Sequence, residues 1–214
     1  KLLSKYKYPD HDGQTQLITL KKANWKYVSF ETKELQKNQT TLIKSDSNEI
    51  CIVVISGKCN VRNQKINLTQ IGDRMSPFER KKPWAVYINK NDFIELKALS
   101  SLEIAICKAP GGGNFESRII SPNQMDSEKR GKGQNKRVVH NILPETEPAN
   151  SLLVVECYTD QGNTSSYPSH KHDTDDFPNE TYLEETYYHR FNPKQGFAFQ
   201  RVYTEDGSLD ESMA

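Results

Sequence analysis

The chain has 214 residues, of which 35% are hydrophobic, and its 29 basic and 28 acidic residues leave a formal net charge of +1. This length suffices for one large domain or two small ones, each with a core, and the balanced charge gives no global attraction to nucleic acid or to membranes. We therefore expect neither as a partner. The low hydrophobic content favours β-barrels, in which every second residue faces outward.

The cysteines and the lack of long apolar segments indicate a compartment. The four cysteines lie in apolar, strand-like runs without metal-binding spacing, so we expect buried thiols in a reducing environment rather than disulfides. No signal-peptide pattern occurs, and no apolar run approaches the roughly 18 residues that span a membrane. The sequence predicts a soluble, cytoplasmic protein. The cysteines are Cys51, Cys59, Cys107 and Cys157.

The first half of the sequence predicts a series of short β-strands. Residues 25–30 alternate between apolar and polar types, and residues 49–55 are continuously apolar, which is typical of a strand buried on both faces. No segment of helical period separates the runs, so we expect an all-β sandwich or barrel over residues 1–115. Three glycines at 111–113 favour a plain connection over a phosphate-binding loop. Further strands are expected at 84–88, 93–98 and 102–107.

Residues 116–137 are polar and predict a segment that connects two domains. Their basic run at 129–137 has no interleaved aromatic residues, so an exposed connection is favoured over a contact with nucleic acid. A third interpretation stays open, in which one cation of the run reaches an active site and holds a substrate carboxylate. Arginine would suit that role best, because its fork binds a carboxylate with two parallel hydrogen bonds.

Residues 138–214 predict a second β domain that carries a candidate metal site. His170 and His172 are spaced i, i+2, which places both imidazoles on one face of an extended strand. A carboxylate from a neighbouring strand would complete three sides of a cage for a divalent metal. Other strands are expected at 138–143, 151–158, 185–190 and 196–203.

Alternation along residues 183–189 selects the third ligand. It places Glu185, Tyr187 and His189 on one face of the expected strand and Glu184 on the other. A carboxylate, a phenol and an imidazole on one face suit a site inside a small barrel. We therefore predict that His170, His172 and Glu185 bind the metal, with Glu184 as the alternative to Glu185.

This pattern resembles the cupin metal motif, in which His-x-His and a later glutamate on adjacent strands bind one divalent ion. The first half of the chain looks like a second cupin without the motif, since no histidine occurs between His11 and His140. The resemblance implies two cupin barrels (double-stranded β-helix, jelly-roll) with metal in the C-terminal one. Cupins have a fourth ligand, a histidine on a late strand. None follows before Ala214, so we expect the second barrel to be incomplete and the fourth ligand to be absent from this sequence.

Longer motifs resemble the 5-deoxyglucuronate isomerase family of bacterial inositol catabolism, which is related to the uronate ketol-isomerases. The resemblance follows the whole chain in order and is most specific in the second half. It implies an aldose–ketose isomerase that converts 5-deoxy-D-glucuronate to 5-dehydro-2-deoxy-D-gluconate. The motifs are RGKG at 130–133, VHNILP at 139–144, SSYP at 165–168, HKHD at 170–173, LEE at 183–185, YYHR at 187–190 and QGFAFQRVYT at 195–204.

Such an isomerase needs a polarised carbonyl and a proton moved through an enediol, with a metal-assisted hydride shift as the rival route. We expect Zn²⁺ as the Lewis acid, with Mn²⁺, Fe²⁺ or Ni²⁺ as alternatives. His189 is the candidate general base, and a structural role in the barrel wall is its alternative. Tyr187 could donate to a sugar oxygen, and Arg201 or Lys171 could hold the substrate carboxylate.

Three points stay open at this stage. If Phe197 and Phe199 face the barrel interior, Arg201 faces it too, whereas Gln200 does so if they cover the outside. The rival functions are a metal-dependent cupin oxygenase and a non-catalytic bicupin that binds sugar acids. The expected partner is a small-molecule sugar acid, and the oligomeric state is open, with a homo-oligomer as one option.

Overall fold

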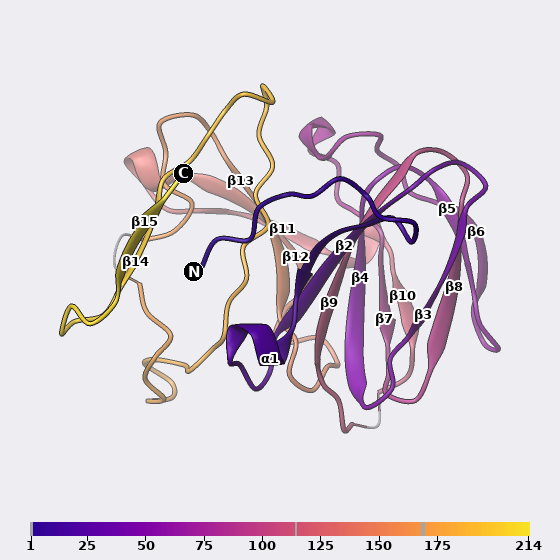
Figure 1. Cartoon of the computed structure of the whole chain (residues 1–214), viewed down its shortest axis with the longest axis horizontal. Helices are drawn as coiled ribbons and strands as arrows, with labels where there is room; N and C mark the ends of the chain where they lie inside the picture. The colour runs from indigo at the N-terminus through magenta and orange to yellow at the C-terminus, as the bar shows by residue number, and fades with distance from the viewer. Residues whose placement is uncertain (1, 114, 168–169) are drawn as a thin grey trace.

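A computed structural model describes residues 2–113, 115–167 and 170–214, and its regular structure is almost entirely β-strand, as the sequence predicted (Figure 1). In these residues a six-stranded sheet of order β1-β2-β9-β4-β7-β10 faces a four-stranded sheet of order β3-β8-β5-β6. A three-stranded sheet, β11-β12-β13, and a hairpin, β14-β15, follow. The strand bounds are β1 Gln14–Ile18, β2 Ser29–Leu35, β3 Thr40–Lys44, β4 Asn48–Ser56, β5 Cys59–Arg62, β6 Asn67–Ile71, β7 Ala85–Ile88, β8 Phe93–Ala98, β9 Leu102–Pro110, β10 Arg118–Ile120, β11 Asp126–Arg130, β12 Arg137–Leu143, β13 Val154–Thr159, β14 Gln200–Tyr203 and β15 Asp210–Met213.

The two facing sheets of the first unit enclose a hydrophobic core in the jelly-roll arrangement of a cupin. The even-numbered residues Ile50, Ile52 and Val54 of β4 point into this core, where they meet the isoleucines of β7, β8 and β9. The odd-numbered Cys51 and Val53 point to the outer side of the six-stranded sheet and are buried as well. The prediction of a strand buried on both faces is therefore confirmed.

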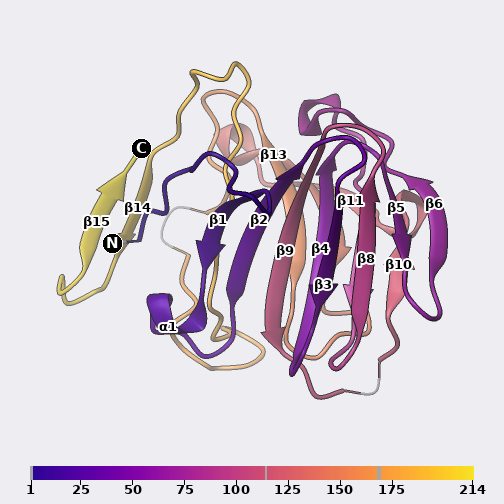
Figure 2. The same cartoon turned by 45° about the vertical axis from the view of Figure 1, so that its right-hand side comes forward.

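The second sheet packs on that outer side and forms a second core with it. Ile142 of β12 and Val154 of β13 contribute to the same cluster as Cys51 and Val53. In Figure 2, β11 and β13 lie behind the strands of the first unit. The six-stranded sheet thus serves as one wall of the first barrel and as the platform for the second half of the chain.

Two buried polar contacts fasten the two halves. Arg74 is 2% exposed, and its Nη2 lies 2.6 Å from Oε1 of Glu156 on β13. Glu49 on β4 is fully buried, and its carboxylate accepts hydrogen bonds from the Tyr87 hydroxyl (2.6 Å) and the Leu152 N–H (2.8 Å). Buried charges persist only when they are paired and hydrogen-bonded, so both contacts fix how the halves meet.

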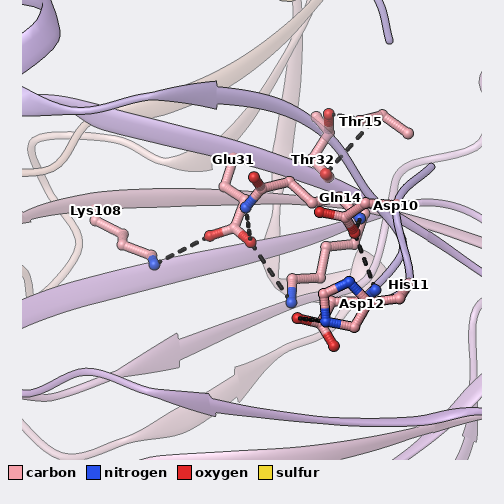
Figure 3. A network of polar contacts seen from close by, with 9 residues as sticks. Asp10, His11, Asp12, Gln14, Thr15, Glu31, Thr32 and Lys108 are labelled. Carbon is pink, nitrogen blue, oxygen red and sulfur yellow. Dashed lines mark hydrogen bonds and ion pairs between the residues drawn. The ribbon is translucent and has the colours of Figure 1, made fainter. Parts of the chain in front are cut away.

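A polar network near the start of the chain attaches β1 to the rest of the six-stranded sheet (Figure 3). Glu31 of β2 accepts a hydrogen bond from Gln14 at 2.9 Å and forms an ion pair with Lys108 of β9 at 3.2 Å. The hydroxyls of Thr15 and Thr32 lie 2.7 Å apart across the β1–β2 pair. The edge strand β1 is therefore attached to the platform by side-chain hydrogen bonds as well as by the backbone hydrogen bonds of the sheet.

Several local predictions differ from the structure. Residues 116–137, expected to form an exposed connection, contain β10, which pairs with β7, and β11, which pairs with β12. A short helix, α1 (Leu20–Ala23), stands in the region expected to be all β. Among the described residues, three 3₁₀ turns occur, at Pro77–Glu79, Pro122–Gln124 and Gly133–Asn135. Within the described ranges, no helix is long and apolar enough to cross a membrane.

The cysteines differ from expectation in burial but not in redox state. All four are free thiols, and Cys51 and Cys59 are buried as predicted. Cys107 is half-buried and Cys157 is exposed. The prediction of a buried thiol is wrong for Cys157, because only one face of β13 packs on the platform and Cys157 lies on the other.

The second half of the chain contains fewer paired β-strands than the sequence predicted. Of the strand expected at 196–203, only β14 forms, and it pairs with β15. Residues 170–172 and 183–190 carry no strand assignment, since the described residues offer them no continuous backbone partner. One rung remains, in which the N–H of Leu183 donates to the carbonyl of His172 at 3.0 Å.

Candidate metal centre

The segment 184–190 is held on the platform by its even-numbered side chains. The carboxylate of Glu184 accepts hydrogen bonds from the backbone N–H groups of Lys26, Tyr27 and Val28 at 2.8, 2.8 and 2.9 Å. These three bonds lower the pKa of the Glu184 carboxyl although its burial acts in the opposite direction. Glu184 therefore anchors this segment through both of its carboxylate oxygens.

Two more even-numbered residues continue the attachment. The Tyr188 ring lies 5.7 Å from the Phe30 ring, and its hydroxyl donates to Glu103 of β9 at 2.7 Å. Arg190 donates to the same Glu103 carboxylate at 2.7 Å. Because side chains of an extended chain alternate, the odd-numbered Glu185, Tyr187 and His189 face away from the platform.

On that opposite face, the structure brings together the three predicted metal ligands. One candidate ligand atom from each of His170, His172 and Glu185 lies within 4.8 Å of the other two. Nε2 of His170 is 3.5 Å from Oε2 of Glu185, and Nε2 of His172 is 3.9 Å from Oε1. The histidine rings lie 5.3 Å apart at an interplanar angle of 75°, although they do not sit on a regular strand. The choice of Glu185 over Glu184 agrees with this geometry.

The hydrogen bonds of the two histidines orient both Nε2 atoms toward Glu185. Nδ1 of His170 lies 3.3 Å from the carbonyl of Tyr167, and Nδ1 of His172 lies 3.1 Å from the carbonyl of Thr181. A carbonyl can only accept, so each Nδ1 donates its N–H, and in the neutral imidazole the lone pair is on the Nε2 that faces Glu185. Metal-bound histidines usually have this second hydrogen bond. Two imidazole nitrogens and one carboxylate fit a Zn²⁺-like divalent ion.

Tyr187 lies directly beside these groups. Its hydroxyl donates to Oε2 of Glu185 at 3.0 Å and lies 3.4 Å from Nε2 of His170. Burial, and then the charge of Glu185, raise the pKa of Tyr187. The hydroxyl is therefore a proton donor that orients the Glu185 carboxylate.

His189 continues a row of aromatic rings on the same face. Its ring is nearly parallel to that of Tyr187, with centroids 6.0 Å apart, and to that of Phe191, with centroids 6.2 Å apart. Nε2 of His189 lies 3.2 Å from Oε1 of Gln200. His189 thus stacks beside Tyr187, whose hydroxyl in turn contacts Glu185 and His170.

The two predicted carboxylate-binding cations are not brought to the ligands. Lys171 lies 3.2 Å from Glu180, and Arg201 forms a two-pronged ion pair with Asp210 at 2.8 Å for each bond. Phe197 and Phe199 are 68% and 81% exposed. Of the two alternatives for β14, Gln200 is the residue that faces His189, while Arg201 lies on the other face.

Comparisons with known proteins agree with this structure. The model of the KduI/IolB family matches residues 2–214. The 5-deoxy-glucuronate isomerase of Geobacillus kaustophilus (strain HTA426) is 48% identical over 205 residues, which are 96% of this chain and 74% of that protein. The Bacillus subtilis (strain 168) protein of the same name is 46% identical over 197 residues, 92% of this chain and 73% of its own. The crystal structure of an IolB-like protein from Salmonella typhimurium LT2 aligns with a TM-score of 0.95 at 48% identity, covering 100% of this chain and 80% of that one.

Proposed function

The chain belongs to the KduI/IolB family, and from that membership we propose that it is the isomerase that converts 5-deoxy-D-glucuronate to 5-dehydro-2-deoxy-D-gluconate in inositol catabolism. The observation that carries the proposal is the identity of 46–48% to curated 5-deoxy-glucuronate isomerases over 92–96% of the chain. The enzyme class, an isomerase, follows from these relatives. The substrate, the metal and the roles of individual residues are our inferences.

The reaction moves a carbonyl from the first to the second carbon of the sugar acid. His170, His172 and Glu185 would hold a divalent metal, Zn²⁺ by our first choice, which supplies Lewis acidity toward the carbonyl and the neighbouring hydroxyl. The arrangement of the two Nε2 atoms around one carboxylate supports this assignment. Tyr187 keeps the Glu185 carboxylate oriented through its hydroxyl.

His189 would move the proton between the two carbons. Oε1 of Gln200 can only accept a hydrogen bond, so Nε2 of His189 carries a proton and Nδ1 is the basic nitrogen. An imidazole titrates near neutral pH and can take up and return a proton in one turnover. The stacked rings of Tyr187 and Phe191 fix the plane in which that nitrogen lies.

The full-length protein tests the proposal directly. We expect it to convert 5-deoxy-D-glucuronate to the ketose when the aldose signals are followed by proton NMR. In D₂O, the proton route would place deuterium on the new hydroxymethyl carbon, whereas a hydride shift would not. An oxygenase would consume O₂ in an electrode, and a binding protein would take up the sugar acid without turnover. Conversion that survives in both His170→Ala and His172→Ala would contradict the metal site.

A further inference from the structure

Arg137 differs from every other arginine in the chain by its partners. Within the described residues, each other arginine has a carboxylate oxygen within 4.0 Å, and Arg137 has none. Its hydrogen bonds leave from Nη1 alone and go to the carbonyl (3.0 Å) and the side-chain oxygen (2.8 Å) of Asn135. A half-buried guanidinium with neutral partners retains an uncompensated charge. The pairs of the others are Arg62–Glu95, Arg74–Glu156, Arg80–Asp160, Arg118–Glu147, Arg130–Glu128, Arg190–Glu103 and Arg201–Asp210.

The register of the second sheet places Arg137 on the face turned away from the platform. Arg137 pairs with Thr159 across β12–β13, and Cys157 lies two residues from Thr159 on the same face, with Sγ 3.7 Å from the threonine hydroxyl. His140, three positions after Arg137 on β12, is by contrast on the platform side, where its ring lies 5.3 Å from that of Tyr158. On the same face, Sγ of Cys157 lies 3.9 Å from the carbonyl of Ser165, in the segment that leads into His170.

Tyr167 connects Arg137 to the metal ligands more directly. The guanidinium carbon lies 5.5 Å from the centre of the Tyr167 ring. The carbonyl of the same tyrosine accepts hydrogen bonds from the backbone N–H of His170 at 3.2 Å and from its Nδ1 at 3.3 Å. Tyr167 therefore holds both groups. Its ring contacts the guanidinium of Arg137, and its carbonyl accepts the hydrogen bonds of His170.

The loop before β12 fixes this arrangement. Besides accepting from Arg137, Asn135 donates through Nδ2 to the hydroxyl of Thr164 at 2.8 Å and to the carbonyl of Ser166 at 2.6 Å. Asn135 thereby ties the guanidinium to the segment that leads into His170. Gly131 has φ of +80°, and a Cβ there would collide with the Asn135 carbonyl oxygen. The glycine is needed for this loop to close.

Other candidates for an anion site carry the wrong charge or are already paired. A hollow of about 230 Å³ opens on the same sheet, but Asp126, Glu128, Glu145 and Glu147 line it and would repel a sugar acid. Lys171 and Arg201, as described above, have carboxylate partners. Near the metal ligands, Arg137 is the arginine with an unpaired charge and an orienting contact.

We propose that Arg137 binds the carboxylate of the sugar-acid substrate, at the end of the molecule opposite to the carbonyl held near His170, His172 and Glu185. This inference rests on the proposed isomerase function. Nε and Nη2 form the free edge of the guanidinium and can donate two parallel hydrogen bonds to a carboxylate. The geometry then explains selection of a sugar acid over a neutral sugar, because the neutral sugar would leave the cation unpaired.

The test compares Arg137→Ala with the wild type in the metal-loaded full-length protein. The probe for binding is D-glucuronate, which carries an aldehyde and a carboxylate at opposite ends, and D-glucose is its neutral counterpart, both followed by calorimetry. We expect the dissociation constant for D-glucuronate to rise at least ~30-fold and kcat/KM for 5-deoxy-D-glucuronate to fall ~100-fold, as for a lost charged hydrogen-bonded pair. Binding of D-glucose, the metal content and the denaturation midpoint should not change.

Arg62→Ala is the matched control, since it removes an exposed arginine from the four-stranded sheet of the first unit. If Arg137→Ala does not fold, Arg137→Gln replaces it with the same expected losses. Wild-type turnover together with unchanged D-glucuronate binding and kcat/KM in the Arg137 variant would overturn this inference alone. A wild type that binds D-glucuronate through Arg137 without turnover would instead contradict the proposed function. The same loss in Arg201→Ala or Lys171→Ala, with Arg137→Ala unaffected, would assign the role elsewhere.

Discussion

Replacing Glu184 should loosen the metal-bearing segment from the platform without touching a metal ligand. Its carboxylate accepts three backbone N–H bonds at 2.8–2.9 Å. Hydrogen bonds to a charged group contribute about 1.5–3 kcal/mol each when buried, and this carboxylate is partly exposed. We therefore expect Glu184→Ala to lower the free energy of unfolding by about 2–4 kcal/mol. Urea unfolding measures that change, and amide hydrogen exchange over residues 183–190 locates it.

A matched substitution separates the charge from the shape of this side chain. Glu184→Gln keeps one acceptor oxygen, so it should lose about half of the stability lost by Glu184→Ala. Glu205→Ala removes an exposed carboxylate of the second half and should unfold like the wild type. Unfolding free energies within about 0.5 kcal/mol of the wild type for both Glu184 variants would refute the anchoring role.

Three further substitutions test the contacts around the site and between the two halves. Tyr187→Phe removes the hydroxyl that donates to Glu185 at 3.0 Å and should weaken metal binding about tenfold, as measured by competition with a chromophoric chelator. Arg74→Met leaves the Glu156 carboxylate without its buried partner and should cost about 3 kcal/mol of stability in urea. Glu49→Gln turns an amide donor toward groups that already donate, so the unfolding midpoint should fall by an amount equivalent to about 2 kcal/mol. An unchanged midpoint in either of the last two variants would show that these contacts do not fasten the halves.

Local patterns in the sequence predicted the features that depend on alternation. The continuous apolar run of β4 requires two packed faces, and the structure places a core on each. The same period of two separates Glu184 from Glu185, because an extended chain alternates its side chains whether or not it pairs with a neighbour. The strands expected at 170–172 and 185–190 do not pair with a neighbour, because the alternation of side chains contains no information on the backbone partner.

Contacts between distant residues could not be predicted in this way. Nothing in the sequence near Arg74 indicates that this arginine will be buried and paired with a carboxylate 82 positions later. Glu184 was considered only as an alternative ligand, and its three N–H donors lie more than 150 positions earlier in the chain. The sequence offers Arg201 or Lys171 for the carboxylate-binding role, with one cation of the run at 129–137 as a further interpretation. Within the described residues, Arg137 is distinguished by having no carboxylate partner, whereas all the other arginines have one, including Arg130 of the same run.

The central claim is that His170, His172 and Glu185 hold the metal of an isomerase, and metal stoichiometry tests it most directly. Full-length wild type, His170→Ala, His172→Ala and Glu185→Gln should be compared with Asp173→Asn, an exposed neighbour of the ligands. The account predicts one divalent ion per wild-type and Asp173→Asn chain, a dissociation constant at least ~100-fold higher in each ligand variant, and isomerisation only in the loaded proteins. Stoichiometric metal that persists in the three ligand variants would contradict it.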